Sequence, residues 1–188
     1  MFEQKIDFEP IIGRAYHIGV ILHDFRLGGS ERIALRLARE WAAQGCRVTL
    51  FVGEDDGPMR SLAGDRVNIQ VADRSVSWRG RDIRRLSRWA TQAAINSRVT
   101  AMFVPGNTYF RSIPVLEQSG ISTISALTNP IVRYDRSAVR NLAFRAVTAW
   151  RLRNVGKFVT PCEEQADEIR SQLGQHVPLA VIPNPVLD

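Results

Sequence analysis

The sequence predicts an α/β domain built on a mostly parallel, doubly wound sheet, with the three-layer arrangement of Rossmann-like domains. Short apolar runs alternate with longer segments of helical periodicity along the chain. Within the runs, apolar residues follow one another instead of alternating with polar ones, which is typical of strands covered on both faces. Right-handed crossovers between such strands would place a ligand site at their carboxyl ends.

Seven apolar runs are predicted to form the strands. Each is short, rich in Val, Ile, Leu or Phe, and flanked by turn-forming or charged residues. The predicted strands are 17–22, 47–53, 67–71, 100–104, 121–127, 157–160 and 180–183. Residues 1–15 precede them as a loosely held arm, so that residues 16–188 are expected to form a single domain.

The segments between these runs carry apolar residues at helical spacing. The predicted helices are 30–44, a short turn at 59–63, 78–98, 110–119, 135–153 and 163–173. Ser30 is the expected N-cap of the first helix, and Gly45 follows its end. In the helix at 78–98, apolar residues from Ile83 to Ala94 recur at spacings of three and four, which predicts one buried face.

The composition predicts a soluble cytoplasmic protein. The chain has 188 residues, 45% of them hydrophobic, and no apolar run long enough to span a bilayer. Its net charge of +6 comes mainly from arginine, which suits phosphate, carboxylate or an anionic surface. No nucleic-acid-binding motif accompanies this charge, so nucleic acid is not an expected partner. Cys46 and Cys162 lack metal-binding spacing and are expected to be reduced thiols.

A glycine pair between the first strand and the first helix predicts an anion-binding corner. Gly28 and Gly29 allow a ligand to approach the backbone, and the helix start offers N–H groups without helical partners. The dinucleotide fingerprint, the P-loop pattern and the G-x-S-x-G elbow are all missing, and the few histidines show no metal spacing. Neither a bound cofactor nor a metal ion is therefore predicted.

Polar residues or glycines follow four of the predicted strands. These pairs are His23-Asp24, Gly53-Glu54, Gly106-Asn107 and Thr128-Asn129. Glycine and asparagine also make good turns, so a single strand end would mean little. Because parallel strands end on one edge of the sheet, the four together predict a site there.

Three segments resemble the retaining family-four glycosyltransferases, which have the GT-B fold. The stretch LGGSERIALRLAREWAAQGCRVTLFVG, at 27–53, resembles the family's glycine loop, first helix and second strand. Residues 158–165 (FVTPCEEQ) resemble its sixth strand and next helix, although the family usually has serine at the position of Cys162. Residues 181–186 (VIPNPV) resemble the end of its N-terminal domain.

The resemblance implies a sugar transferase that takes its sugar from a nucleotide-diphosphate donor. The nucleotide sugar would be a co-substrate, and the acceptor a sugar, a glycan or a lipid-linked molecule. The N-terminal domain would hold the acceptor while its glycine loop approaches the donor diphosphate. Gly28 and Gly29 would form that loop, with the N–H groups of Ser30 and Glu31 at the helix start.

Further site residues are carried over by position. Asn129 stands where many family members have a histidine near the transferred sugar; it can hydrogen-bond a hydroxyl but is no base at neutral pH. Asn107 and Arg133 are added as predicted donor- or acceptor-binding residues. The family's C-terminal donor-binding domain would begin where this sequence stops, at Asp188. We therefore expect the isolated chain to be inactive and to work with that domain or with a separate subunit.

Two alternatives remain open at this point. The arginine- and tryptophan-rich segments at 78–98 and 133–153 suit an anionic membrane surface, as at the inner face of the cytoplasmic membrane. They also suit solvated helix faces with the tryptophans in the core. The chain could likewise be a binding module or partner subunit without catalysis of its own.

Overall fold

The computed structural model describes residues 16–73, 83–128, 138–152, 156–174 and 177–183. They contain one seven-stranded sheet with the order β3-β2-β1-β4-β5-β6-β7, in which all neighbouring strands are parallel. The strands are β1 (His17–Leu22), β2 (Arg47–Val52), β3 (Asn68–Val71), β4 (Ala101–Pro105), β5 (Ser122–Ala126), β6 (Lys157–Thr160) and β7 (Leu179–Val181). The predicted doubly wound parallel sheet is confirmed.

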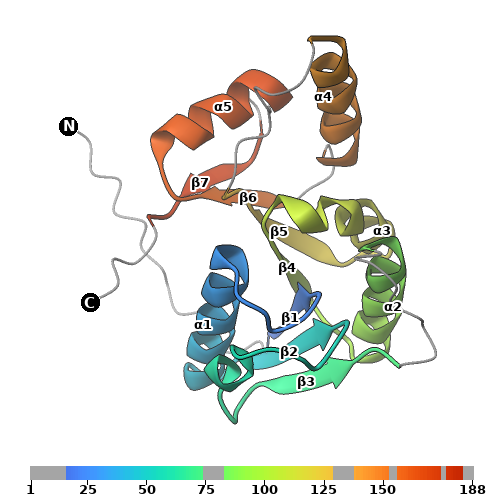
Figure 1. Cartoon of the computed structure of the whole chain (residues 1–188), viewed down its shortest axis with the longest axis vertical. Helices are drawn as coiled ribbons and strands as arrows, with labels where there is room; N and C mark the ends of the chain where they lie inside the picture. The colour runs from blue at the N-terminus through green and yellow to red at the C-terminus, as the bar shows by residue number, and fades with distance from the viewer. Residues whose placement is uncertain (1–15, 74–82, 129–137, 153–155, 175–176, 184–188) are drawn as a thin grey trace.

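Helices cover the sheet on both faces, with α1 on one side and α2 and α3 on the other (Figure 1). The helical elements are α1 (Gly29–Ala43), η1 (Arg60–Ala63), α2 (Ile83–Asn96), η2 (Asn107–Ser112), α3 (Ile113–Gln118), α4 (Ala138–Leu152) and α5 (Glu163–Leu173). None of the helices in the described part of the chain is long and apolar enough to cross a membrane.

The two-sided cover explains why consecutive residues of the central strand β1 are apolar. Side chains along a strand point to alternate faces, so Val20 and Leu22 join the core against α1. Ile21, between them, joins the separate core against α2 and α3. All three side chains are buried, and a polar residue at any of these positions would face a core.

Two predicted helix boundaries are wrong in an informative way. Ser30 is not the N-cap of α1, because the extended backbone of Gly28 takes that position and no side chain caps the helix. The helix predicted at 110–119 is a 3-10 turn, η2, followed by the short helix α3. Pro114, which has no N–H to donate, stands in the first turn of α3 and marks where the regular helix begins.

Three predicted segments fall wholly or partly outside the described residues. They are the arm at 1–15, the start of the helix at 78–98 and both ends of the helix at 135–153.

Candidate functional site

The candidate site lies where the connections of the sheet diverge, between β1 and β4. From β1 the chain moves outward through β2 to β3, and from β4 it moves the other way through β5 to β7. Ligands of open parallel sheets bind at such a switch point, outside the carboxyl ends of the strands. The loop after β1, the start of η2 and the residue Thr128 after β5 lie together at this edge, joined by side-chain contacts to α1 and Tyr109.

The start of α1 presents backbone donors at this edge. The first intrahelical hydrogen bond runs from the Arg32 N–H to the Gly28 carbonyl, at 3.0 Å. The N–H groups of Gly29, Ser30 and Glu31 therefore have no acceptor within the helix. A Cβ atom placed on Gly29 would meet no heavy atom within 4 Å. The backbone at Gly29 is consequently open to an approaching group.

The Ser30 side chain connects the start of α1 to the ends of two strands instead of capping the helix. Its hydroxyl lies 3.0 Å from the hydroxyl of Thr128, beyond the end of β5. Gly106, which follows β4, packs against the same serine, because a Cβ atom at Gly106 would stand 2.9 Å from Ser30 Oγ. These contacts hold the helix start against the carboxyl ends of β4 and β5.

Tyr109 ties the loop after β1 to α1, and the sequence reasoning missed it. Its buried hydroxyl accepts the His23 N–H at 2.9 Å and donates to Glu31 Oε1 at 3.4 Å. Burial, together with the charges of Glu31 and Asp24, raises the pKa of the Tyr109 phenol, which therefore stays protonated and can donate. The available signal was an aromatic residue with a polar tip three residues after a strand-end glycine.

The charge around the glycine loop is mixed. The Glu31 carboxylate turns back over Gly28, because a Cβ atom at Gly28 would come within 2.1 Å of Oε2. Arg26, in the loop itself, is exposed and forms ion pairs with Asp56 at 3.1 Å and Glu54 at 3.6 Å. In the described part of this corner, an anion would therefore meet backbone N–H donors and one arginine, Arg26, that already pairs with acidic side chains.

The remaining predicted site residues are placed in part. Asn107 is the half-buried first residue of η2, on the same edge of the sheet as the glycine loop. Asn129 and Arg133 lie outside the described residues. Within the ranges that the structure describes, no three His, Cys, Asp or Glu side chains are grouped so that they could hold a metal ion.

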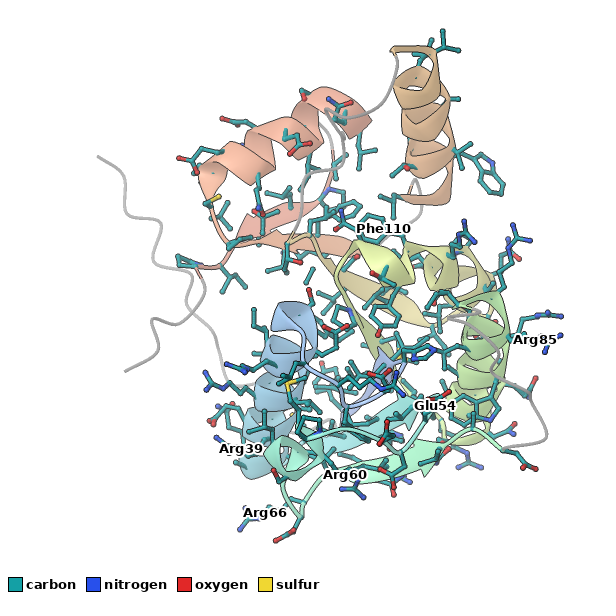
Figure 2. The ribbon with its side chains drawn as sticks, viewed as in Figure 1. Arg39, Glu54, Arg60, Arg66, Arg85 and Phe110 are labelled. Atoms are coloured by element: carbon teal, nitrogen blue, oxygen red, sulfur yellow. The ribbon has the colours of Figure 1, made fainter. Side chains whose placement is uncertain are left out.

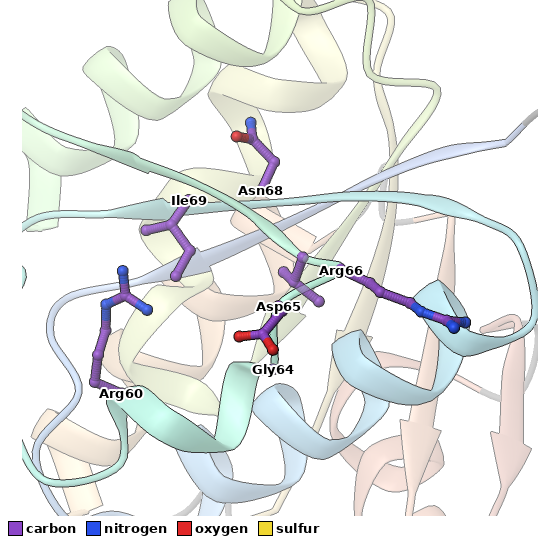
Figure 3. Close-up of a pocket in the computed structure, with 7 residues that line it drawn as sticks. Arg60, Gly64, Asp65, Arg66, Asn68 and Ile69 are labelled. Carbon is purple, nitrogen blue, oxygen red and sulfur yellow. The ribbon is translucent and has the colours of Figure 1, made fainter.

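A separate surface hollow runs along the edge strand β3, away from this corner (Figure 3). It has a volume of about 540 Å³ and is lined by Arg60, the segment 64–67 and the first residues of β3. Figure 2 shows Arg39, Arg60 and Arg66 at the same end of the domain. The Arg60 guanidinium, which lines the hollow, forms an ion pair with Asp55 at 2.7 Å, so its charge is already balanced.

A parallel sheet covered by helices on both faces, with a glycine loop and a helix start at its switch point, defines a doubly wound α/β domain of the Rossmann-like class. The sequence pattern of the glycosyl transferase 4-like domain matches residues 28–185. The chain therefore belongs to the glycosyl transferase 4-like domain family. A comparison with curated protein sequences gave no match.

Solved structures of GT-B glycosyltransferases share the fold. HepE (Alr3699) from Anabaena, solved with UDP and glucose, has a TM-score of 0.66 at 14% identity, over 90% of this chain and 44% of its own. Sucrose-phosphate synthase from Thermosynechococcus elongatus has a TM-score of 0.66 at 13% identity, over 89% and 48%. MurG from Acinetobacter baumannii has a TM-score of 0.52 at 17% identity, over 77% and 41%. The chain thus spans less than half the length of each.

Gly106→Ala should destabilise the domain by about 1–3 kcal/mol. Gly106 has φ +70° and ψ 168°, a conformation almost confined to glycine, and the added methyl group would meet Ser30 Oγ. Urea unfolding of both proteins measures the difference. Gly120→Ala is the matched control, since Gly120 has φ +76° but open space around the Cβ position. A loss no larger than that of the control would show that the contact with Ser30 does not constrain position 106.

Tyr109→Phe should be less stable than the wild type at pH 8 by about 1–3 kcal/mol, because the His23 N–H loses its buried acceptor. The difference should shrink above about pH 10. There the unfolded wild type loses a proton that the folded state, with its raised pKa, retains; this favours unfolding by up to about 1.4 kcal/mol per pH unit.

Urea unfolding between pH 8 and pH 11 measures both effects. Phe110→Leu keeps the tyrosine, so its difference from the wild type should not change with pH through this group. A constant difference for Tyr109→Phe up to pH 11 would contradict the assigned shift.

Proposed function

We propose that this domain is the acceptor-side half of a retaining glycosyltransferase that moves a sugar from a nucleotide-diphosphate donor to an acceptor. The observation that carries the proposal is the helix start of α1, which is held open at the switch point and lies within the family match at 28–185. The UDP and glucose in the HepE structure support a nucleotide sugar as co-substrate. No bound cofactor is required.

The chemistry asks the glycine loop to stabilise a departing diphosphate. Backbone N–H groups that are already oriented at a helix start suit this, because they need not reorganise as negative charge develops. The N–H groups of Gly29, Ser30 and Glu31 would approach the diphosphate. The Glu31 carboxylate, now turned over Gly28, would either move aside or accept a hydrogen bond from a sugar hydroxyl.

The mixed charge of the corner supports a requirement for a second half. A nucleotide diphosphate carries several negative charges, whereas Arg26 already pairs with Asp56 and Glu54. Cations from elsewhere would therefore have to balance the donor. We propose that they come from a C-terminal donor-binding domain of the same protein or from a separate subunit, and that the 188-residue chain alone is inactive. Its span, less than half of the solved glycosyltransferases above, supports this.

The acceptor would be a sugar, a glycan or a lipid-linked molecule held at the same edge. Asn129 is proposed to hydrogen-bond a hydroxyl of the transferred sugar, and Asn107 and Arg133 to contact donor or acceptor. A cytoplasmic location is proposed as well, in keeping with two free cysteines, Cys46 and Cys162.

Gly29→Val tests the loop. In the protein that contains both halves, transfer from a nucleotide sugar should fall by about a hundredfold or more, because the isopropyl group fills the space that the diphosphate needs. Stability should stay within about 0.5 kcal/mol, since the Cβ position is open. Radiolabelled sugar transfer and urea unfolding measure the two quantities.

Ala43→Val is the matched control, because it places valine at the exposed far end of the same helix. It should leave transfer unchanged. Unchanged transfer in Gly29→Val would remove the loop from the mechanism. A wild-type protein that binds its partner half but transfers no sugar from any nucleotide donor would instead indicate a binding module without catalysis.

A further inference from the structure

Helix α4 carries an apolar face that is turned away from the protein. Its members are all apolar, and all are exposed: Val139, Leu142, Ala143, Ala146, Val147 and Trp150. Val139 is 78% exposed, Leu142 67% and Trp150 57%. We refer to these six residues as the outer face of α4. Exposed apolar side chains that are scattered singly need no explanation, but a contiguous exposed apolar surface usually marks an interaction site.

The spacing of the outer face shows that it is a second, separate stripe on the helix. Its residues recur at i, i+3, i+4, i+7, i+8 and i+11, which places them along one side of a helix. Thr148 and Leu152 are buried and fall on the opposite side by the same spacing. α4 packs against η2, α3 and α5 at the periphery of the domain (Figure 1). One side of α4 is therefore already packed against the domain, and the outer face is a second apolar side that the domain does not cover.

The described tryptophans differ in a way that singles out α4. Trp41 packs edge to face against Phe103, and Trp89 against Phe51. Both are partly buried and pack against the cores, which favours the interpretation of α2 as a solvated arginine-rich helix whose tryptophan packs inward. Trp150 is 57% exposed on the outer face of α4. Tryptophan is enriched at membrane–water interfaces, because its ring is apolar and its N–H is polar.

The charge of α4 identifies the kind of surface that would meet it. The sequence of the helix contains three arginines and no acidic residue. Of its neighbours, α5 carries several acidic residues, whereas η2 has the exposed Arg111 in its last turn. An apolar stripe with tryptophan on a cationic helix suits the headgroup region of an anionic bilayer.

A second protein domain at the glycine corner would not cover this face. α4 connects the parallel strands β5 and β6, so it starts near the carboxyl edge and runs back toward the opposite edge. Trp150 lies eleven residues after Val139, about 16 Å further along the helix axis. A domain placed across the carboxyl edge would reach the first turn of α4 and leave Trp150 exposed.

We propose that the outer face of α4 docks the protein on an anionic phospholipid membrane.

Vesicle co-sedimentation of the 188-residue chain tests the proposal without any assay of transfer. The wild type should pellet with vesicles of phosphatidylglycerol and phosphatidylcholine, and much less with phosphatidylcholine alone. The double substitution Val139→Ser and Leu142→Ser should weaken binding to the anionic vesicles by about tenfold or more, because two apolar side chains no longer enter the interface. The unfolding midpoint should not change, since both side chains are exposed.

Ile95→Ser is the matched control, because Ile95 is 43% exposed on α2, a helix that is also rich in arginine. It should bind as the wild type does. The emission of Trp150, obtained as the difference between the wild type and Trp150→Phe, should shift to shorter wavelength on adding anionic vesicles. Failure of the wild type to pellet, equal pelleting of all variants, or equal pelleting with neutral vesicles would each overturn the proposal. So would a dimer in solution that the double substitution dissociates.

Discussion

The parallel direction of all seven strands is the constraint from which the rest of the structure follows. Parallel neighbours cannot be joined by tight turns, so each connection crosses the sheet, and most carry a helix onto one face. Both faces are then covered, which is why Val20, Ile21 and Leu22 can all be apolar while serving two different cores. The same direction brings every strand's carboxyl end to one edge. Residues as far apart in sequence as Ser30 and Thr128 meet there as a result.

The corner at that edge is held by side-chain hydrogen bonds that leave the backbone donors of α1 open. Tyr109 binds the His23 N–H and the Glu31 carboxylate, and Ser30 binds Thr128. These four side chains and one backbone group fix the helix start from two sides, which restricts its motion before any ligand arrives. Preorganisation of this kind favours the stabilisation of developing charge. Because its hydroxyl binds Thr128, Ser30 does not cap α1, although serine is well suited to capping.

The fold was predictable from the sequence because its signals are local. Short segments with consecutive apolar residues, such as 17–22 and 157–160, predicted strands whose bounds the structure reproduces. Gly28, Gly29 and the polar strand ends were predictable for the same reason, since a turn residue after an apolar run is visible in sequence. Tyr109 was not, because its role depends on an edge that forms only when β1, β4 and α1 are packed together. The tight approach of Gly106 to Ser30 is equally non-local.

Helix α4 shows where periodicity alone is ambiguous. An apolar stripe on a helix predicts burial, and in α2 the stripe Ile83, Leu86, Ala90 and Ala94 is indeed buried. In α4, Leu142 and Trp150 obey the same spacing but point outward, while Thr148, a polar residue, is buried. α4 has more apolar residues than its packed side can bury. This excess, and not the arginine content, distinguishes α4 from α2. A helix that needed only solubility would place polar residues on its outer side, as α1 does with Arg39 and Glu40. The outer face of α4 is therefore better explained by contact with an apolar environment than by exposure to water.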